Sequence, residues 1–179
     1  FETLVEAVQA LPGVELLIAG GGELQAGLQA RIHAATPAGQ RPATRLLGDV
    51  SDGEKHALLQ QCDTFCLASR ERTEAFGVVL LEAMLHAKPC IVTDLPGSGM
   101  PWVVALARAG LRVPIEDIAG WRSALTRLQH DPATIARGEE LKDELLRNPI
   151  VREFSGSLWL DIKAALLDAE LADLGVVIS

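Results

Sequence analysis

Two glutamates placed eight positions apart are the side chains in this sequence that most clearly could do chemistry. Glu74 and Glu82 enclose an apolar run that contains a single glycine, Gly77. Residues 63–68 have the composition of a buried strand, and residues 77–87 repeat apolar positions with helical spacing. The pattern predicts a strand, a polar loop and a helix. One carboxylate would lie on the loop, and the other would lie about one and a half turns inside the helix.

A strand–loop–helix junction of this kind suits a phosphate. Its unpaired backbone N–H groups and the positive end of the helix dipole point at whatever lies beyond the strand. The expected donors are the backbone N–H groups of Phe76, Gly77 and Val78. Because carboxylates repel phosphate, the expected targets of Glu74 and Glu82 are hydroxyl groups, as on a ribose or a hexose. In the ordinary alternative, Glu74 is a solvated or capping residue and Glu82 an exposed helix residue; an inward-facing Glu82 would need a partner.

Other candidate site residues also follow expected strands. The glycine run lets a ligand or another domain approach the backbone. The loop after residue 47 is also a strand-to-helix turn, which does not compete with a role in binding. Ligands of parallel sheets bind outside the carboxyl ends of the strands, so these loops should converge on one edge. The residues are Gly20, Gly21 and Gly22, then Gly48, Asp49 and Val50, and finally Ser69.

Helical and strand patterns alternate along the chain. The expected strands cover residues 14–19, 44–47, 63–68, 89–93 and 111–113. The expected helices cover residues 2–10, 23–35, 51–61, 77–87 and 102–108, with another starting at Asp131-Pro132 and a last amphipathic one over about 155–172. This alternation predicts an α/β fold: one Rossmann-like domain over residues 1–179, with a parallel sheet covered by helices on both faces.

Composition excludes several classes of partner. The chain has 179 residues and a net charge of −8, which argues against nucleic acid and against an anionic membrane surface. No run of eighteen apolar residues occurs, so we expect no transmembrane segment. No signal peptide opens the sequence. Cys62, Cys66 and Cys90 are expected to be free thiols in a reducing compartment, which predicts a cytoplasmic location, and no metal site is expected.

Ordered sequence blocks resemble a known family. The block from Glu74-Ala-Phe-Gly77 to Glu82-Ala-Met is preceded by Leu16-Leu-Ile-Ala-Gly20-Gly-Gly22 and by Leu46-Leu-Gly48-Asp-Val50, and it is followed by Gly97-Ser-Gly-Met-Pro-Trp102. Together they resemble the donor-binding, C-terminal half of retaining GT-B glycosyltransferases of the family 4 group. The resemblance covers roughly residues 4 to 160.

The resemblance implies a role for each site residue. Glu74 would be catalytic, contacting the donor sugar and stabilising charge at the reacting centre. Glu82 would accept hydrogen bonds from the ribose, and residues 76–78 would hold the distal phosphate. Gly20–Gly22 would face the phosphates and the interdomain cleft, and Gly48–Val50 would contact the base. Ser69 could bond to the donor or to its own loop. The nucleotide sugar is a substrate, and neither a cofactor nor a metal is implied.

The resemblance also implies a missing part. Complete enzymes of the family carry an N-terminal acceptor-binding domain. They also carry an Arg, in a Gly-Arg strand, and a Lys that together neutralise the pyrophosphate. No residue of this sequence matches these elements. The full protein would transfer a hexose to a glycan or lipid-linked acceptor, with membrane association left open, and the isolated chain would be inactive. The alternatives are a non-catalytic nucleotide- or sugar-binding module and a GT-B epimerase or phosphorylase relative. Trp102 is expected to pack. One of Arg70 and Arg72 is expected either to replace a missing cation or to be solvated.

Overall fold

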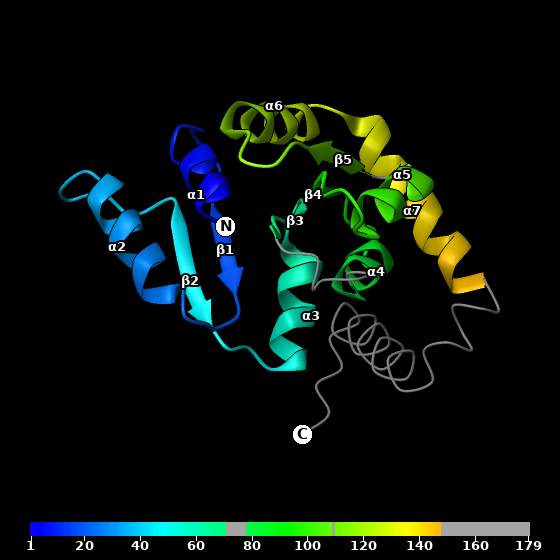
Figure 1. Cartoon of the computed structure of the whole chain (residues 1–179). Coiled ribbons are helices and arrows are strands. Elements are labelled where there is room, and N and C mark those ends of the chain that lie inside the picture. The colour runs from blue at the N-terminus through cyan, green and yellow to red at the C-terminus, as the bar shows by residue number, and fades with distance from the viewer. Residues whose placement is uncertain (71–77, 109, 148–179) are drawn as a thin grey trace, which may run out of the picture.

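Helices and parallel strands alternate through the computed structural model, which describes residues 1–70, 78–108 and 110–147 (Figure 1). The strands are β1 (Leu16–Ala19), β2 (Thr44–Gly48), β3 (Phe65–Leu67), β4 (Cys90–Thr93) and β5 (Gly110–Val113). The helices are α1 (Glu2–Gln9), α2 (Gln25–Ala35), α3 (Asp52–Gln61), α4 (Val78–Leu85), α5 (Met100–Ala107), α6 (Ile118–Gln129) and α7 (Pro132–Arg147). The predicted α/β class is confirmed, and the expected helix over 155–172 lies outside the described residues.

Helix α6 is absent from the sequence-based prediction, although the sequence carries its signals. The side chain of Asp117 accepts a hydrogen bond from the backbone N–H of Gly120 at 2.8 Å and so caps the first turn. Trp121, Leu125 and Leu128 then fall on one face, and all three are buried. The helix therefore forms for the same reasons as the predicted ones.

Side-chain caps fix the starts of two other helices. At the start of α3, the Ser51 hydroxyl accepts from the backbone N–H of Glu54, and the Glu54 carboxylate accepts from the backbone N–H of Ser51 at 2.8 Å. This reciprocal pair is the capping box that the sequence predicts. At α7, one carboxylate oxygen of Asp131 accepts from the backbone N–H groups of Ala133 and Thr134.

The strands form two separate parallel sheets rather than the single sheet expected. One sheet pairs β1 with β2, and the other has the order β3–β4–β5. No strand within the described residues pairs with the second edge of β1 or of β3. Each sheet therefore ends in an edge strand whose backbone groups lack a ladder partner on one side.

Strand β4 is the centre of the larger sheet and is buried along its whole length. Cys90 and Val92 pack on one face in a cluster with residues of α4, α5 and α7. Ile91 points to the other face and packs with residues of α1 and α6. Successive strand residues alternate between faces, so this division shows that helices cover both sides of the sheet.

Helix α1 connects the two sheets. Leu4 and Val8 pack in the same cluster as Ile91, whereas Val5 packs with Ile18 of β1 and with residues of α2. The apolar face of α1 thus holds the small sheet against the large one. None of the helices in residues 1–70, 78–108 and 110–147 is both long and apolar enough to cross a bilayer.

Candidate functional site

The structure brings together the glycine run and the loop after β2, as expected from parallel strands. The backbone N–H of Gly20 donates to the carbonyl of Gly48 at 2.7 Å. The backbone N–H of Gly21 donates to the carboxylate of Asp49 at 3.0 Å. Val50 follows, half-buried, and leads directly into the cap of α3. The two predicted loops therefore form one continuous surface beyond the ends of β1 and β2.

Glycine is favoured at this surface for two different reasons. Gly20 and Gly48 have φ values of 118° and 70°, which other residues rarely adopt. At Gly21 the constraint is space, because a Cβ there would lie 2.9 Å from the Asp49 carboxylate oxygen. The backbone is left open to approach by a ligand, and one of its N–H groups is already held by a carboxylate.

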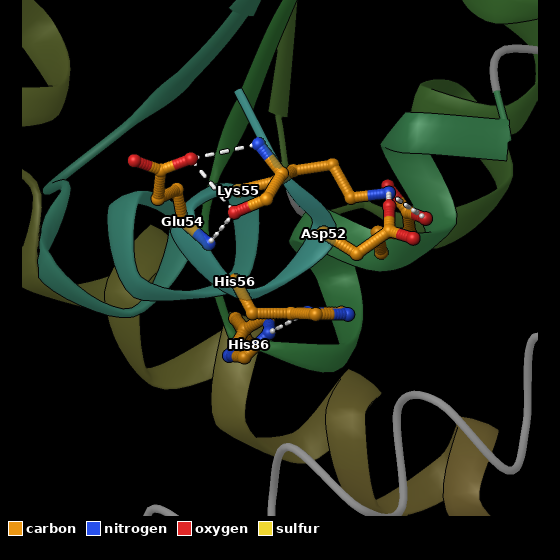
Figure 2. A network of polar contacts seen from close by, with 7 residues as sticks. Asp52, Glu54, Lys55, His56 and His86 are labelled. Carbon is orange, nitrogen blue, oxygen red and sulfur yellow. Dashed lines mark hydrogen bonds and ion pairs between the residues drawn. The ribbon is translucent and has the colours of Figure 1, made fainter.

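Glu82 faces inward, and a lysine compensates the charge of its buried carboxylate. The residue is only 4% exposed, and its carboxylate accepts a hydrogen bond from the Lys55 ammonium at 2.9 Å. The same ammonium lies 3.2 Å from the carboxylate of Asp52, the first residue of α3. Figure 2 shows Lys55 reaching along α3 past Asp52. The alternative of an exposed helix glutamate is excluded.

Lys55 was not identified from the sequence. Desolvation of its ammonium disfavours the charged form, but hydrogen bonds and Coulombic attraction from Glu82 and Asp52 outweigh it and raise the pKa of Lys55. The ammonium is therefore charged at neutral pH. Nothing in its local sequence indicates this role, because its partner lies 27 positions away on another helix.

A second polar contact joins α3 to the end of α4. Nδ1 of His56 and Nε2 of His86 are 3.1 Å apart, so one ring donates to the other (Figure 2). Burial, followed by the positive charges of His56, Lys88 and Lys142, lowers the pKa of His86 to about 4. The His86 ring is therefore neutral at physiological pH, and a neutral ring has one nitrogen that can accept and one that can donate in this hydrogen bond.

The remaining predicted residues near β3 are placed only in part. Ser69 follows β3 and is half-buried, and Val78 is the first residue of α4. Glu74, Phe76 and Gly77 lie outside the described residues. Their proposed roles therefore remain predictions.

Arg70 is exposed, as its solvated alternative expects, and it also pairs with two carboxylates. Its guanidinium lies 3.4 Å from the carboxylate of Glu2 and forms a second ion pair with Glu116. It thereby ties the end of β3 to the start of α1 and to the segment before α6. Because both carboxylates compensate its charge, Arg70 is a structural tie rather than a free cation for phosphate.

The expectation that Trp102 packs is wrong. The side chain stands at the start of α5 and is 62% exposed. The apolar face of α5 is made instead by Met100, Val104 and Ala107, which all join the main core cluster. Because these three residues face the core, Trp102 lies on the outer side of α5.

The cysteines are free thiols, as expected. Burial raises the pKa of Cys66 to about 12, and it also raises the pKa values of Cys62 and Cys90. All three thiols are therefore protonated at neutral pH and poor nucleophiles. They belong to the packed interior and not to the site.

Comparison with known proteins gives the family. Residues 1–131 match the model of the family described as glycosyl transferases group 1, and the chain belongs to this family. A curated relative, the D-rhamnosyltransferase WbpZ of Pseudomonas aeruginosa, is 36% identical over 127 residues, covering 70% of this chain and 32% of the relative. The chain therefore spans about a third of the length of that relative.

Solved structures agree on the fold. WaaG, a glycosyltransferase involved in lipopolysaccharide biosynthesis, superposes with a TM-score of 0.68 at 22% identity, covering 92% of this chain and 42% of that one. The spinosyn rhamnosyltransferase SpnG, solved with thymidine diphosphate, gives a TM-score of 0.62 at 21% identity, covering 86% of this chain and 40% of that one. These neighbours are GT-B glycosyltransferases, and the predicted Rossmann-like unit of that fold is confirmed.

Proposed function

We propose that this chain is the donor-binding domain of a retaining glycosyltransferase that transfers a hexose from a nucleoside-diphosphate sugar to a glycan or lipid-linked acceptor. The observation that carries the proposal is the joining of the glycine turn to the loop after β2 by the Gly21–Asp49 hydrogen bond. This surface lies outside the carboxyl ends of parallel strands, where open α/β sheets bind nucleotides.

The proposed roles divide the donor among several elements. Residues 48–50 contact the base through main-chain groups, and Glu82 accepts hydrogen bonds from the ribose. The backbone at residues 20–22 and 76–78 faces the phosphates, where N–H groups stabilise the departing diphosphate. Glu74 contacts the sugar and stabilises charge at the reacting carbon, and Ser69 bonds to the donor or to the loop. The proposal needs neither a metal nor a cofactor.

Two similarities support this assignment. The relative WbpZ is named as a D-rhamnosyltransferase, and the structural neighbour SpnG was solved with thymidine diphosphate. The first supports transfer of a sugar, and the second supports a donor activated by a nucleoside diphosphate. A cytoplasmic location suits such a donor and is part of the same proposal.

The proposed complete enzyme contains further elements before residue 1. Within the described residues, one edge of β1 and one edge of β3 have no partner strand, which leaves room in the hydrogen-bonding pattern for another parallel strand that would join the two sheets. We assign to that upstream segment the cationic residues that neutralise the pyrophosphate, and to an N-terminal domain the acceptor site. Catalysis then takes place between the two domains.

Isothermal titration of this chain with UDP, GDP, ADP and CDP tests the proposal. We expect weak but saturable binding of at least one nucleotide, because part of the phosphate site is assigned to upstream residues. Glu82→Ala should weaken that binding, whereas Glu139→Ala, the same substitution at an exposed position of α7, should not. Absence of heat with all four nucleotides at millimolar concentration would refute the donor-site assignment.

A further inference from the structure

We propose that Lys55 is a positioning residue that holds the Glu82 carboxylate ready to receive the ribose hydroxyls of a nucleoside diphosphate. The inference rests on the proposed function, because it assigns Glu82 to the ribose. It adds a residue and a physical reason: the acceptor is fixed in place before the nucleotide arrives. Lys55 itself need not touch the nucleotide.

Within the described residues, Lys55 contacts one of the two Glu82 carboxylate oxygens. Lys55 donates to Oε1 of Glu82 at 2.9 Å. In the part of the chain that the structure describes, no other side chain bonds to this carboxylate. A carboxylate offers about four acceptor positions, so the oxygen that Lys55 does not hold can still accept from a hydroxyl. The Lys55 side chain is 30% exposed and that of Glu82 is 5% exposed, so the lysine reaches solvent in part while the glutamate is buried.

Lys55 also connects two parts of the proposed nucleoside site. It belongs to α3, which begins immediately after the loop at residues 48–50, and its ammonium is shared with Asp52 in the first turn of that helix (Figure 2). Glu82 belongs to α4, which follows β3. One ammonium thus links the helix after the proposed base loop to the helix that carries the proposed ribose acceptor. The spacing between the proposed base and ribose contacts would thereby depend on this ammonium.

The physical advantage is preorganisation. An unpaired Glu82 carboxylate would be buried at a high cost or would rotate toward water, and either change removes the acceptor from its position. Held by Lys55, the carboxylate binds a hydroxyl without first losing rotational freedom. A purely structural ion pair would stabilise the chain without making nucleotide affinity depend on the ribose hydroxyls. The dependence of nucleotide affinity on the ribose hydroxyls therefore separates a positioning role of Lys55 from a purely structural one.

The test compares UDP, GDP and ADP with their 2′,3′-dideoxy forms by isothermal titration on the 179-residue chain. For the nucleotide that binds best, we expect the wild-type chain to bind the ribose form about tenfold or more tightly than the dideoxy form, as hydrogen bonds to a charged acceptor allow. Lys55→Met should reduce this ratio to about two or less, since the acceptor is no longer held. Lys55→Arg should restore most of it, and Glu82→Gln should also reduce it.

The control is Lys142→Met, the same substitution on α7, where Lys142 pairs with Glu139 at the surface. It should leave the ratio unchanged, and circular dichroism should show that both Met variants are folded. An unchanged ratio in Lys55→Met would overturn the inference, whether the variant weakens the ribose and dideoxy forms equally or weakens neither. A wild-type ratio near one would overturn it while leaving nucleotide binding intact. If the wild-type chain binds no nucleotide at all, the proposed function fails and this inference fails with it.

Discussion

Gly138 of α7 should not tolerate alanine, although a helix interior ordinarily favours that substitution. Gly138 is buried where α7 crosses the end of α4, and a Cβ there would lie 2.4 Å from the backbone carbonyl oxygen of Ala87. A backbone carbonyl cannot rotate out of the way as a side chain can. The two helices would have to separate by several tenths of an ångström, at the end of the helix that carries Glu82.

The cost can be worked out against a matched glycine. Gly27 lies in α2, is exposed, and has no heavy atom within 4 Å of the position that a Cβ would take. Both substitutions gain helix propensity, about 1 kcal/mol at most. Overpacking costs about 1–3 kcal/mol, and the backbone contact at Gly138 favours the upper end. We therefore expect Gly138→Ala to lower the free energy of unfolding by about 2 kcal/mol and Gly27→Ala to raise it by up to about 1 kcal/mol.

Urea unfolding of the two variants and the wild-type chain measures this difference directly. In thermal unfolding, where 1 kcal/mol corresponds to about 2–4 °C for a chain of this size, the Tm values of the two variants should differ by roughly 6–12 °C. Subtracting the Gly27→Ala value removes the common propensity gain and leaves the packing cost alone. If Gly138→Ala proves as stable as Gly27→Ala, the close approach of α7 to the end of α4 is not a constraint and the reasoning is refuted.

Three further predictions concern the end of α4 and the proposed site. Ala87 has a φ of 58°, so Ala87→Gly should raise the free energy of unfolding by up to about 1 kcal/mol in urea unfolding, and a loss of stability would contradict this. His86 has a folded pKa of about 4 against 6.5 for an unperturbed His, so the unfolded chain binds more protons than the folded chain between these pH values. The free energy of unfolding should therefore fall by about 1–2 kcal/mol from pH 6.5 to pH 4, after allowance for partial exposure. His86→Gln should remove this part of the pH dependence. In the proposed complete enzyme, Glu74→Ala should abolish transfer but spare nucleotide affinity, whereas Glu82→Ala should weaken affinity; equal losses of affinity would contradict the division of roles.

The alternation of helices and strands could be predicted because it depends on local patterns. The strand over residues 90–93 is a short apolar run that ends in Thr93, and the helix from Asp52 begins at a capping box that is visible in the sequence. Pairing between strands could not be predicted in the same way. The separation of β1 and β2 from the other strands depends on which edges meet in space, and no local pattern encodes that.

The site was predictable as a set of loops but not as a set of contacts. Parallel strands place their carboxyl ends together, so the approach of Gly21 to Asp49 follows from the topology. The pairing of Lys55 with Glu82 depends on how two helices are rotated against each other. The exposure of Trp102 likewise depends on which side of α5 meets the core. Such rotations are decided by packing across the whole domain.

The contact between α3 and α4 shows how a polar pair can decide such a rotation. From Val78 to Leu85, Glu82 is the single polar side chain of α4, so apolar burial alone distinguishes poorly between its faces. Lys55 and His56 are adjacent on α3, and their partners Glu82 and His86 are four positions apart, hence on one face of α4 and its end. A rotation of α4 by one residue, about 100°, would bury Glu82 without its ammonium. The ion pair therefore selects one orientation of α4 because the others carry an uncompensated charge, and the same orientation keeps the buried Glu82 beside Lys55, where it is proposed to receive the ribose hydroxyls.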